Sequence, residues 1–252
     1  MRRGAHADIL GMMRLFNASL AMAAALGAAV VLSAPRPAAA QSNGCPAFDR
    51  PSVQVDFQVV PLGRDDTRST AQLAGLPGRA PGPAGASGGN ILGLAHAKYG
   101  EQSQLGVLFQ PQGDGSVCAA LSAVKVTFGF IERVVYVARE LPRGSCIHGE
   151  VLAHEMMHVA TDEALLKEFA PAIRRRIETA AARLGSVRAR SQQQAAQALR
   201  RPLDTALKEL LQDFSRERDR RQAKVDTIAE YKRVSGSCGG ELSKYIKGKT
   251  KL

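Results

Sequence analysis

The hydrophobic pattern of the chain changes its period near Pro142, and this change limits the folds that the chain can adopt. Before it, segments such as Pro51–Leu62 alternate apolar and polar residues, which is typical of β-strands. After it, apolar residues recur at helical spacing over Ile147–Phe169 and Leu203–Ile228. Strand-rich sequence followed by helix-rich sequence predicts an α+β fold.

We expect a small, mostly antiparallel sheet followed by a long helical hairpin. The Gly113–Gly115 turn favours a β-hairpin. Ser145 is a good N-cap for the first long helix, whereas Pro171 and Pro202 are expected to kink or restart the helices. The expected strands are Pro51–Leu62, Leu105–Gln110, Leu121–Phe130 and Arg133–Ala138.

The first forty residues have the layout of a secretory signal peptide. Basic residues precede the apolar run Leu15–Leu32, and Ala38–Ala40 supplies the small residues of a cleavage site. Cleavage after Ala40 predicts a periplasmic or secreted protein without a stable membrane anchor. The alternative is a retained anchor, because the apolar run is just long enough to span a bilayer. Met12 and Met13 are alternative start positions to Met1.

The remaining sequence divides into three segments. Residues 41–144 form a β-rich part that contains a Gly/Pro-rich loop at 75–90, where nine of sixteen residues are Gly or Pro. Residues 145–237 form the helical part, and residues 238–252 form a basic tail.

Four cysteines, Cys45, Cys118, Cys146 and Cys238, follow the expected cleavage site. An even number of cysteines outside the cytosol predicts two disulfides, and the three possible pairings remain open. If Cys146 pairs with Cys238, the start of the helical part is joined to its end, and the first and last helices run antiparallel.

The chain is basic, with 34 Lys and Arg against 23 Asp and Glu, yet it contains no Trp and few other aromatics. This composition argues against a base-stacking nucleic-acid surface, and no base-reading motif is visible. We expect the basic clusters, such as Arg216–Arg221, to be solvated helix faces. An anionic envelope surface is the alternative partner for them.

Residues 154–158 read His-Glu-Met-Met-His, an HExxH motif. On a helix, His154 and His158 lie one turn apart on one face, so both imidazoles can bind one metal ion. Glu155 lies about 100° round the helix, where it can reach a water molecule rather than the metal. Imidazole ligands suit Zn²⁺, and a neighbouring carboxylate suits a general base, so the motif predicts zinc-dependent hydrolysis of peptide bonds.

The segment Val134–His158 resembles small bacterial secreted proteins that are predicted to be zinc-dependent proteases. The resemblance rests on Val135–Ala138, Gly144–Cys146 and Val151–Glu155. It implies a zincin-like fold that carries the HExxH motif on its first long helix, and peptidase activity on a peptide or protein substrate. In zincins, a strand just before this helix often forms the edge against which the substrate pairs, and Arg133–Ala138 would be that strand.

The third zinc ligand is expected to be a carboxylate from a downstream helix. Two carboxylate pairs lie one turn apart, Glu209/Asp213 and Asp226/Glu230, and this spacing suits one ligand and one orienting group. Asp162 shares the face of the HExxH motif, but a straight helix places it about 12 Å along the axis from the first histidine. Asp162 is therefore expected to be a solvated or supporting carboxylate.

A disulfide between the two ends of the helical part would select among these carboxylates. Counting eight residues inward from each cysteine places His154 level with Glu230. The same count places His158 level with Asp226.

A hairpin folded at Gly185 would instead bring the first histidine near Asp213 and Glu217. Because the two prolines make a straight hairpin improbable, we favour the disulfide-joined geometry. We therefore expect Glu230 as the third ligand, with Asp226 as the next choice.

Two functions follow from the sequence. The first is an exported zinc-dependent peptidase that uses Glu155 as its general base. The alternative is a non-enzymatic, exported helical protein that contacts the envelope through its basic surface, with a structural or vestigial metal site.

Overall fold

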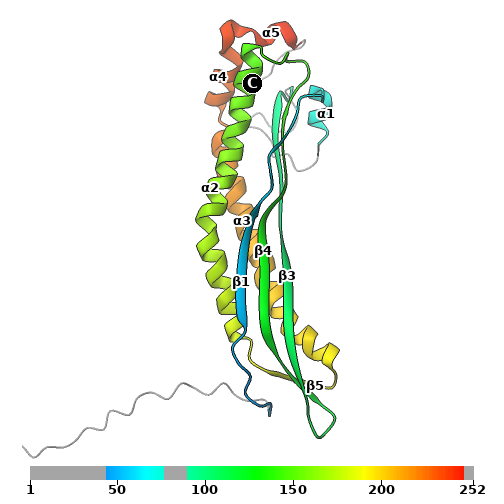
Figure 1. Ribbon diagram of the computed structural model, residues 1–252. Coiled ribbons are helices and arrows are strands. Elements are labelled where there is room, and N and C mark those ends of the chain that lie inside the picture. Colours follow the sequence, from blue (N-terminus) through cyan, green and yellow to red (C-terminus); the bar gives the residue numbers. More distant parts are fainter. Residues whose placement is uncertain (1–43, 77–89, 247–252) are drawn as a thin grey trace, which may run out of the picture. The chain divides into compact units, whose positions relative to one another are not determined.

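The computed structural model of the chain describes residues 44–76 and 90–246 (Figure 1). The expected signal peptide, most of the Gly/Pro-rich loop and the end of the basic tail lie outside these described residues. The described residues all belong to one compact unit, Ala40–Leu252.

The sheet is organised around one long strand, β4 (Val117–Val137). Strand β3 (Gly93–Pro111) pairs antiparallel with β4 along its whole length. On the other side of β4 lie, one after another, β5 (Val187–Ala189), β1 (Ser52–Val59) and β2 (Gly63–Asp65). Within the described part of the chain, β3 has no second strand neighbour, so it forms an edge of the sheet.

The prediction of a small, mostly antiparallel sheet is wrong, although the α+β class is confirmed. The sheet has five strands, and β1 and β2 pair with β4 in the parallel direction. Segments that we expected to be separate strands, Leu121–Phe130 and Arg133–Ala138, belong almost entirely to β4. A register shift against β3 interrupts the alternation between them. Alternation reveals a strand but not its neighbour, so the parallel pairing was not visible in the sequence.

Two long helices follow the β3–β4 hairpin. Helix α2 (Cys146–Arg183) begins after Ser145, whose side chain accepts a hydrogen bond from the His148 N–H, as predicted. Helix α3 (Gln192–Val225) runs back beside α2 (Figure 1). Both helices continue through the prolines that we expected to restart them, Pro171 and Pro202.

The two helices and the sheet share one hydrophobic core. Phe214 of α3 lies at its centre, with its ring edge-on to Phe128 at 5.3 Å and to Phe130 at 6.1 Å. The fully buried side chains of α2 and α3 in this core include Leu165, Ile173, Ile177, Leu199 and Leu203. This core fixes the position of α2 against the sheet, and with it the position of the HExxH motif.

A second core lies at the start of α2, where the chain ends. Helix α4 (Ile228–Gly236), the short turn Cys238–Gly240 and helix α5 (Leu242–Tyr245) gather beside this end of α2 (Figure 1). Val234, Leu242 and Ile246 pack there with Ile147 and Val151. The described start of the tail is thus packed against the helical part.

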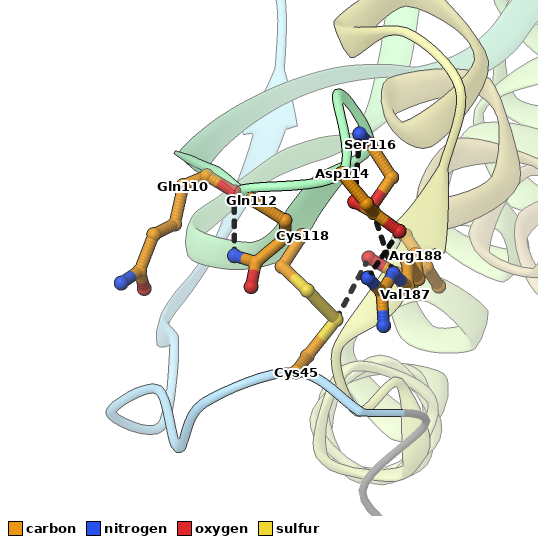
Figure 2. Close-up of a disulfide and its surroundings, with 8 residues drawn as sticks. All are labelled: Cys45, Gln110, Gln112, Asp114, Ser116, Cys118, Val187 and Arg188. Atoms are coloured by element: carbon orange, nitrogen blue, oxygen red, sulfur yellow. Dashed lines mark hydrogen bonds and ion pairs between the residues drawn. A yellow bond between two sulfur atoms is a disulfide. The ribbon is translucent and has the colours of Figure 1, made fainter.

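Two disulfides join distant parts of the chain, as the cysteine count predicted. Cys146 pairs with Cys238 and so holds the end of α4 against the start of α2. Cys45 pairs with Cys118 beside the tip of the β3–β4 hairpin (Figure 2). There Arg188 of β5 donates hydrogen bonds to Ser116 and Asp114, both at 2.7 Å.

Among the described helices, none has the length and continuous apolar sequence needed to cross a bilayer.

A small helix, α1 (Thr70–Ala74), lies between β2 and β3 in the chain. Its buried Leu73 packs on Tyr136 and Ala138, on the side of the sheet opposite α2.

Candidate metal centre

The HExxH motif lies on α2 at the point where α3 ends. The Nε2 atoms of His154 and His158 lie 3.2 and 3.1 Å from the same oxygen, Oδ1 of Asp226. The two rings are 5.0 Å apart and nearly perpendicular. Ligand atoms of these three residues all lie within 4.8 Å of one another, so the group could hold a metal ion.

The donor set fits a zinc-like cation. Three donors at about 2.0–2.1 Å from one tetrahedral ion would be about 3.3 Å apart, close to the oxygen–nitrogen distances observed here. The side chains of His154, His158 and Asp226 are 10, 12 and 18 % exposed, so the centre is sheltered but not sealed. Two imidazoles and one carboxylate leave the fourth position of such an ion for water or substrate.

The structure places Asp226, our second choice, between the two histidines, and Glu230 beside them. Oε1 of Glu230 lies 3.4 Å from Nδ1 of His154, on the side of the ring that faces away from Asp226. Arg233 donates two hydrogen bonds to the Glu230 carboxylate, each at 2.8 Å. Glu230 therefore occupies the place of a group that orients a ligand.

The two pairs that the count from the cysteines predicts are both in contact, since Glu230 lies 3.4 Å from His154 and Asp226 lies 3.1 Å from His158, but the count did not reveal that Asp226 also contacts His154. The helix breaks at Asp226, which ends α3, and Thr227 starts α4 as a new N-cap. Asp226 therefore contacts both histidines, and Gln222 contacts His158 from the preceding turn of α3. The alternative hairpin at Gly185 is wrong, because Asp226 and Gln222 face the two histidines in place of Asp213 and Glu217.

Two further polar groups contact the centre. The amide oxygen of Gln222 accepts a hydrogen bond from Nδ1 of His158. The Tyr231 hydroxyl donates to Oδ1 of Asp226 at 3.2 Å, and its ring stands edge-on to His154. Gln222 lies one turn before Asp226 on the same helix face. That spacing was the one sequence signal that could have revealed it.

Glu155 is buried between α2 and β3. The backbone N–H of Ala95 donates a hydrogen bond to its carboxylate. Gly93 makes room for this side chain, since a Cβ at position 93 would lie 2.5 Å from Oε1 of Glu155. The strand edge beside the motif is therefore β3, not Arg133–Ala138 as expected, because residues 134–136 of β4 pair with β2 on one side and β3 on the other.

The electrostatics of the site favour a positive charge at its centre. Burial raises the pKa of the Asp226 carboxyl, but hydrogen bonds and charges from the two histidines outweigh burial and lower it. Burial alone would lower the pKa of His154 and His158, yet the hydrogen bond to Asp226 and the nearby carboxylates raise both. The arrangement therefore favours positive charge between Asp226 and the two rings, which is the kind of charge that a divalent cation would bring.

For the pKa of Glu155, in contrast, burial outweighs the nearby charges and hydrogen bonds. Burial raises its pKa to about 7, although the charges of His158 and His154 and the Ala95 N–H act in the other direction. A carboxyl group with a pKa near 7 is well matched to taking and returning protons near neutral pH.

The other candidate residues lie away from the centre. Asp162 is buried rather than solvated, and it receives two hydrogen bonds from Arg218. Asp213 pairs with Arg176 and Arg216, and Glu217 with Arg220 and Arg221. The other two histidines of the described residues also lie beside carboxylates, His148 beside Asp66 and His96 beside Glu132. Glu209, the partner of Asp213 in the first pair, is not part of the group around the histidines.

Comparisons of this chain with protein-family models, with curated proteins and with solved structures find no match.

Proposed function

We propose that the chain is an exported zinc-dependent peptidase whose zinc is held by His154, His158 and Asp226. The observation that carries this proposal is the convergence of both Nε2 atoms on one oxygen of Asp226, 3.1–3.2 Å away. A buried glutamate with a pKa of about 7 lies beside this group, on the residue that follows the first histidine. This combination of ligands and base suits hydrolysis by an activated water.

Zinc supplies Lewis acidity at such a site: it polarises a carbonyl group and makes a water molecule easier to deprotonate. Glu155 accepts a proton from the attacking water and delivers it to the leaving nitrogen of the peptide bond. Glu230 and Gln222 hold the two histidines by their Nδ1 atoms, which keeps both Nε2 atoms turned toward the centre.

The outer edge of β3 supports a peptide as substrate. Ala95 lies on this edge, and its N–H already points out of the sheet to Glu155. An extended peptide that pairs with such an edge is recognised through its backbone, with little demand on its sequence.

The two disulfides support an oxidising location, and we propose that the protein acts in the periplasm or outside the cell. The N-terminal sequence of the protein isolated from that compartment is expected to begin at Gln41.

The envelope-interaction alternative requires free positive charge on the helices. Arginines 216, 218, 220 and 221 each pair with a carboxylate of this chain. This densest basic run is therefore largely neutralised internally, which favours the peptidase.

The test is to measure zinc content and proteolysis of an unstructured protein such as casein, for the wild-type chain and for Glu155→Gln. We expect about one zinc per chain in both proteins and hydrolysis by the wild type alone. Absence of zinc from both proteins would contradict the metal site. Zinc in both without cleavage by the wild type would contradict the peptidase.

A further inference from the structure

Four side chains form a polar network between α2 and α3 that begins at His158 of the candidate metal centre and extends one turn beyond it. His158 and Asp162 lie one turn apart on α2, and Arg218 and Gln222 lie one turn apart on α3. The helices are antiparallel, so each step of four residues along α2 is matched by four residues back along α3. Gln222 is 7 % and Asp162 4 % exposed, which makes this network part of the interior.

The hydrogen bonds of this network fix the orientation of the Gln222 amide. Its nitrogen lies 3.1 Å from the His158 carbonyl oxygen and 2.5 Å from Oδ1 of Asp162. A carbonyl and a carboxylate can only accept hydrogen bonds, so the NH₂ group must face them. The amide oxygen is therefore left to face Nδ1 of His158.

This orientation decides which nitrogen of His158 is available to a metal. An amide oxygen can only accept, so Nδ1 must carry a proton. A neutral imidazole carries a single N–H, and its lone pair is then on Nε2, the atom that points to Asp226.

Asp162 is itself held in place. Nε and Nη2 of Arg218 donate to its two oxygens at 2.8 and 2.9 Å. The Arg218 guanidinium in turn lies over the Tyr99 ring of β3, 5.8 Å from its centroid. The chain of contacts thus runs from the sheet, through both helices, to the metal-ligand histidine.

We propose that Gln222 is a positioning residue for metal binding, and that the Asp162–Arg218 pair sets its amide orientation so that His158 offers Nε2 to the metal. This inference rests on the proposed metal site. The Asp162–Arg218 ion pair then does more than join two helices, because it also helps to orient a metal-ligand histidine.

The test uses the full oxidised chain, stripped of metal and titrated with Zn²⁺ against a chromophoric chelator. Gln222→Met keeps the length of the side chain but removes the acceptor. We expect it to bind zinc about 10- to 100-fold more weakly than wild type and to alter the visible spectrum of bound Co²⁺. If Gln222→Met does not fold, Gln222→Asn is used instead. Its side chain is one methylene shorter, so the amide oxygen no longer reaches His158, and we expect the same loss of zinc affinity.

A matched variant separates positioning from general packing. Glu168→Gln breaks a different ion pair between the helices, with Arg221 at 2.6 Å, and should leave zinc affinity unchanged.

The outcomes distinguish the inference from the function on which it rests. Wild-type affinity and an unaltered Co²⁺ spectrum in the Gln222→Met protein would overturn the inference while leaving the metal site intact. So would equal losses of zinc affinity in the Gln222→Met and Glu168→Gln proteins, because equal losses would mark a packing effect. Failure of the wild-type chain itself to bind zinc would instead refute the proposed function.

Discussion

Replacing Glu155 with glutamine is expected to stabilise the metal-free chain near neutral pH, and this gain should vanish in acid. Burial raises the pKa of Glu155 from 4.5 to about 7. At a pH below 4.5, the carboxyl is protonated in both the folded and the unfolded chain, so its ionisation has no effect on stability. As the pH rises through this window, the unfolded chain ionises first and folding loses stability.

The magnitude follows from the size of the shift. One pKa unit corresponds to about 1.4 kcal/mol, so ionised Glu155 destabilises the folded chain by about 3 kcal/mol above pH 7. Because Glu155 is almost completely buried, solvent screening does not reduce this figure much. Glutamine cannot ionise, and the Glu155→Gln protein therefore escapes the loss.

Urea unfolding of both oxidised proteins, with a chelator present and at a series of pH values, measures this effect. The difference in unfolding free energy should grow by about 3 kcal/mol in favour of Glu155→Gln between about pH 4 and pH 8. Glu168→Gln is a control for which the change of stability with pH should have the opposite sign, since the hydrogen bond from Arg221 lowers the pKa of Glu168. That variant should lose stability relative to wild type as the pH rises. A difference between wild type and Glu155→Gln that is the same at both ends of the range would refute the reasoning.

Three further sets of variants test the geometry. Asp226→Ala should weaken zinc binding more than Glu230→Gln, because in the proposed site Asp226 offers a ligand oxygen and Glu230 only holds a histidine. Chelator competition should show zinc binding that is about 10- to 100-fold weaker than wild type for Glu230→Gln. Gly93→Ala adds a methyl group 2.5 Å from an oxygen of the buried glutamate. We expect a loss of about 1–3 kcal/mol in thermal melts, together with a lower rate of peptide cleavage. Cys238→Ser should lower the free energy of unfolding by about 2–4 kcal/mol and also weaken zinc binding, because it removes the disulfide that holds α4. Cys118→Ser should lower the free energy of unfolding by a similar amount and leave zinc binding unchanged. Equal zinc affinities in the two serine variants would contradict the last expectation.

The sequence predicted those parts of the site that depend on a single helix. Ser145 caps α2 as expected, and the four-residue spacing puts His154 and His158 on one face. It also suggested the two disulfides and a short list of carboxylates that included Asp226. These predictions succeed because N-capping and the 3.6-residue period are properties of the local backbone.

The sequence did not reveal how the long strands pair. Gly93–Gln104 lacks the clear alternation of a half-buried strand, yet it forms most of the edge strand that holds Glu155. The parallel partners of β4 come from residues 52–65, which are separated from it by a helix and another long strand. Pairing over such distances depends on which faces pack together, and hydrophobic period alone does not encode it.

The division between sequence and structure is clearest at the metal centre. The chain's own pattern determined two imidazoles, a turn apart, with a glutamate between them. Only the packing of α2 against α3 decided that Asp226 completes the group, that Gln222 and Glu230 hold the rings, and that burial brings the pKa of Glu155 to about 7. The reason is physical: helical geometry places neighbours within one turn, whereas an aspartate some seventy residues away is placed by the break after α3 and by the register of two packed helices.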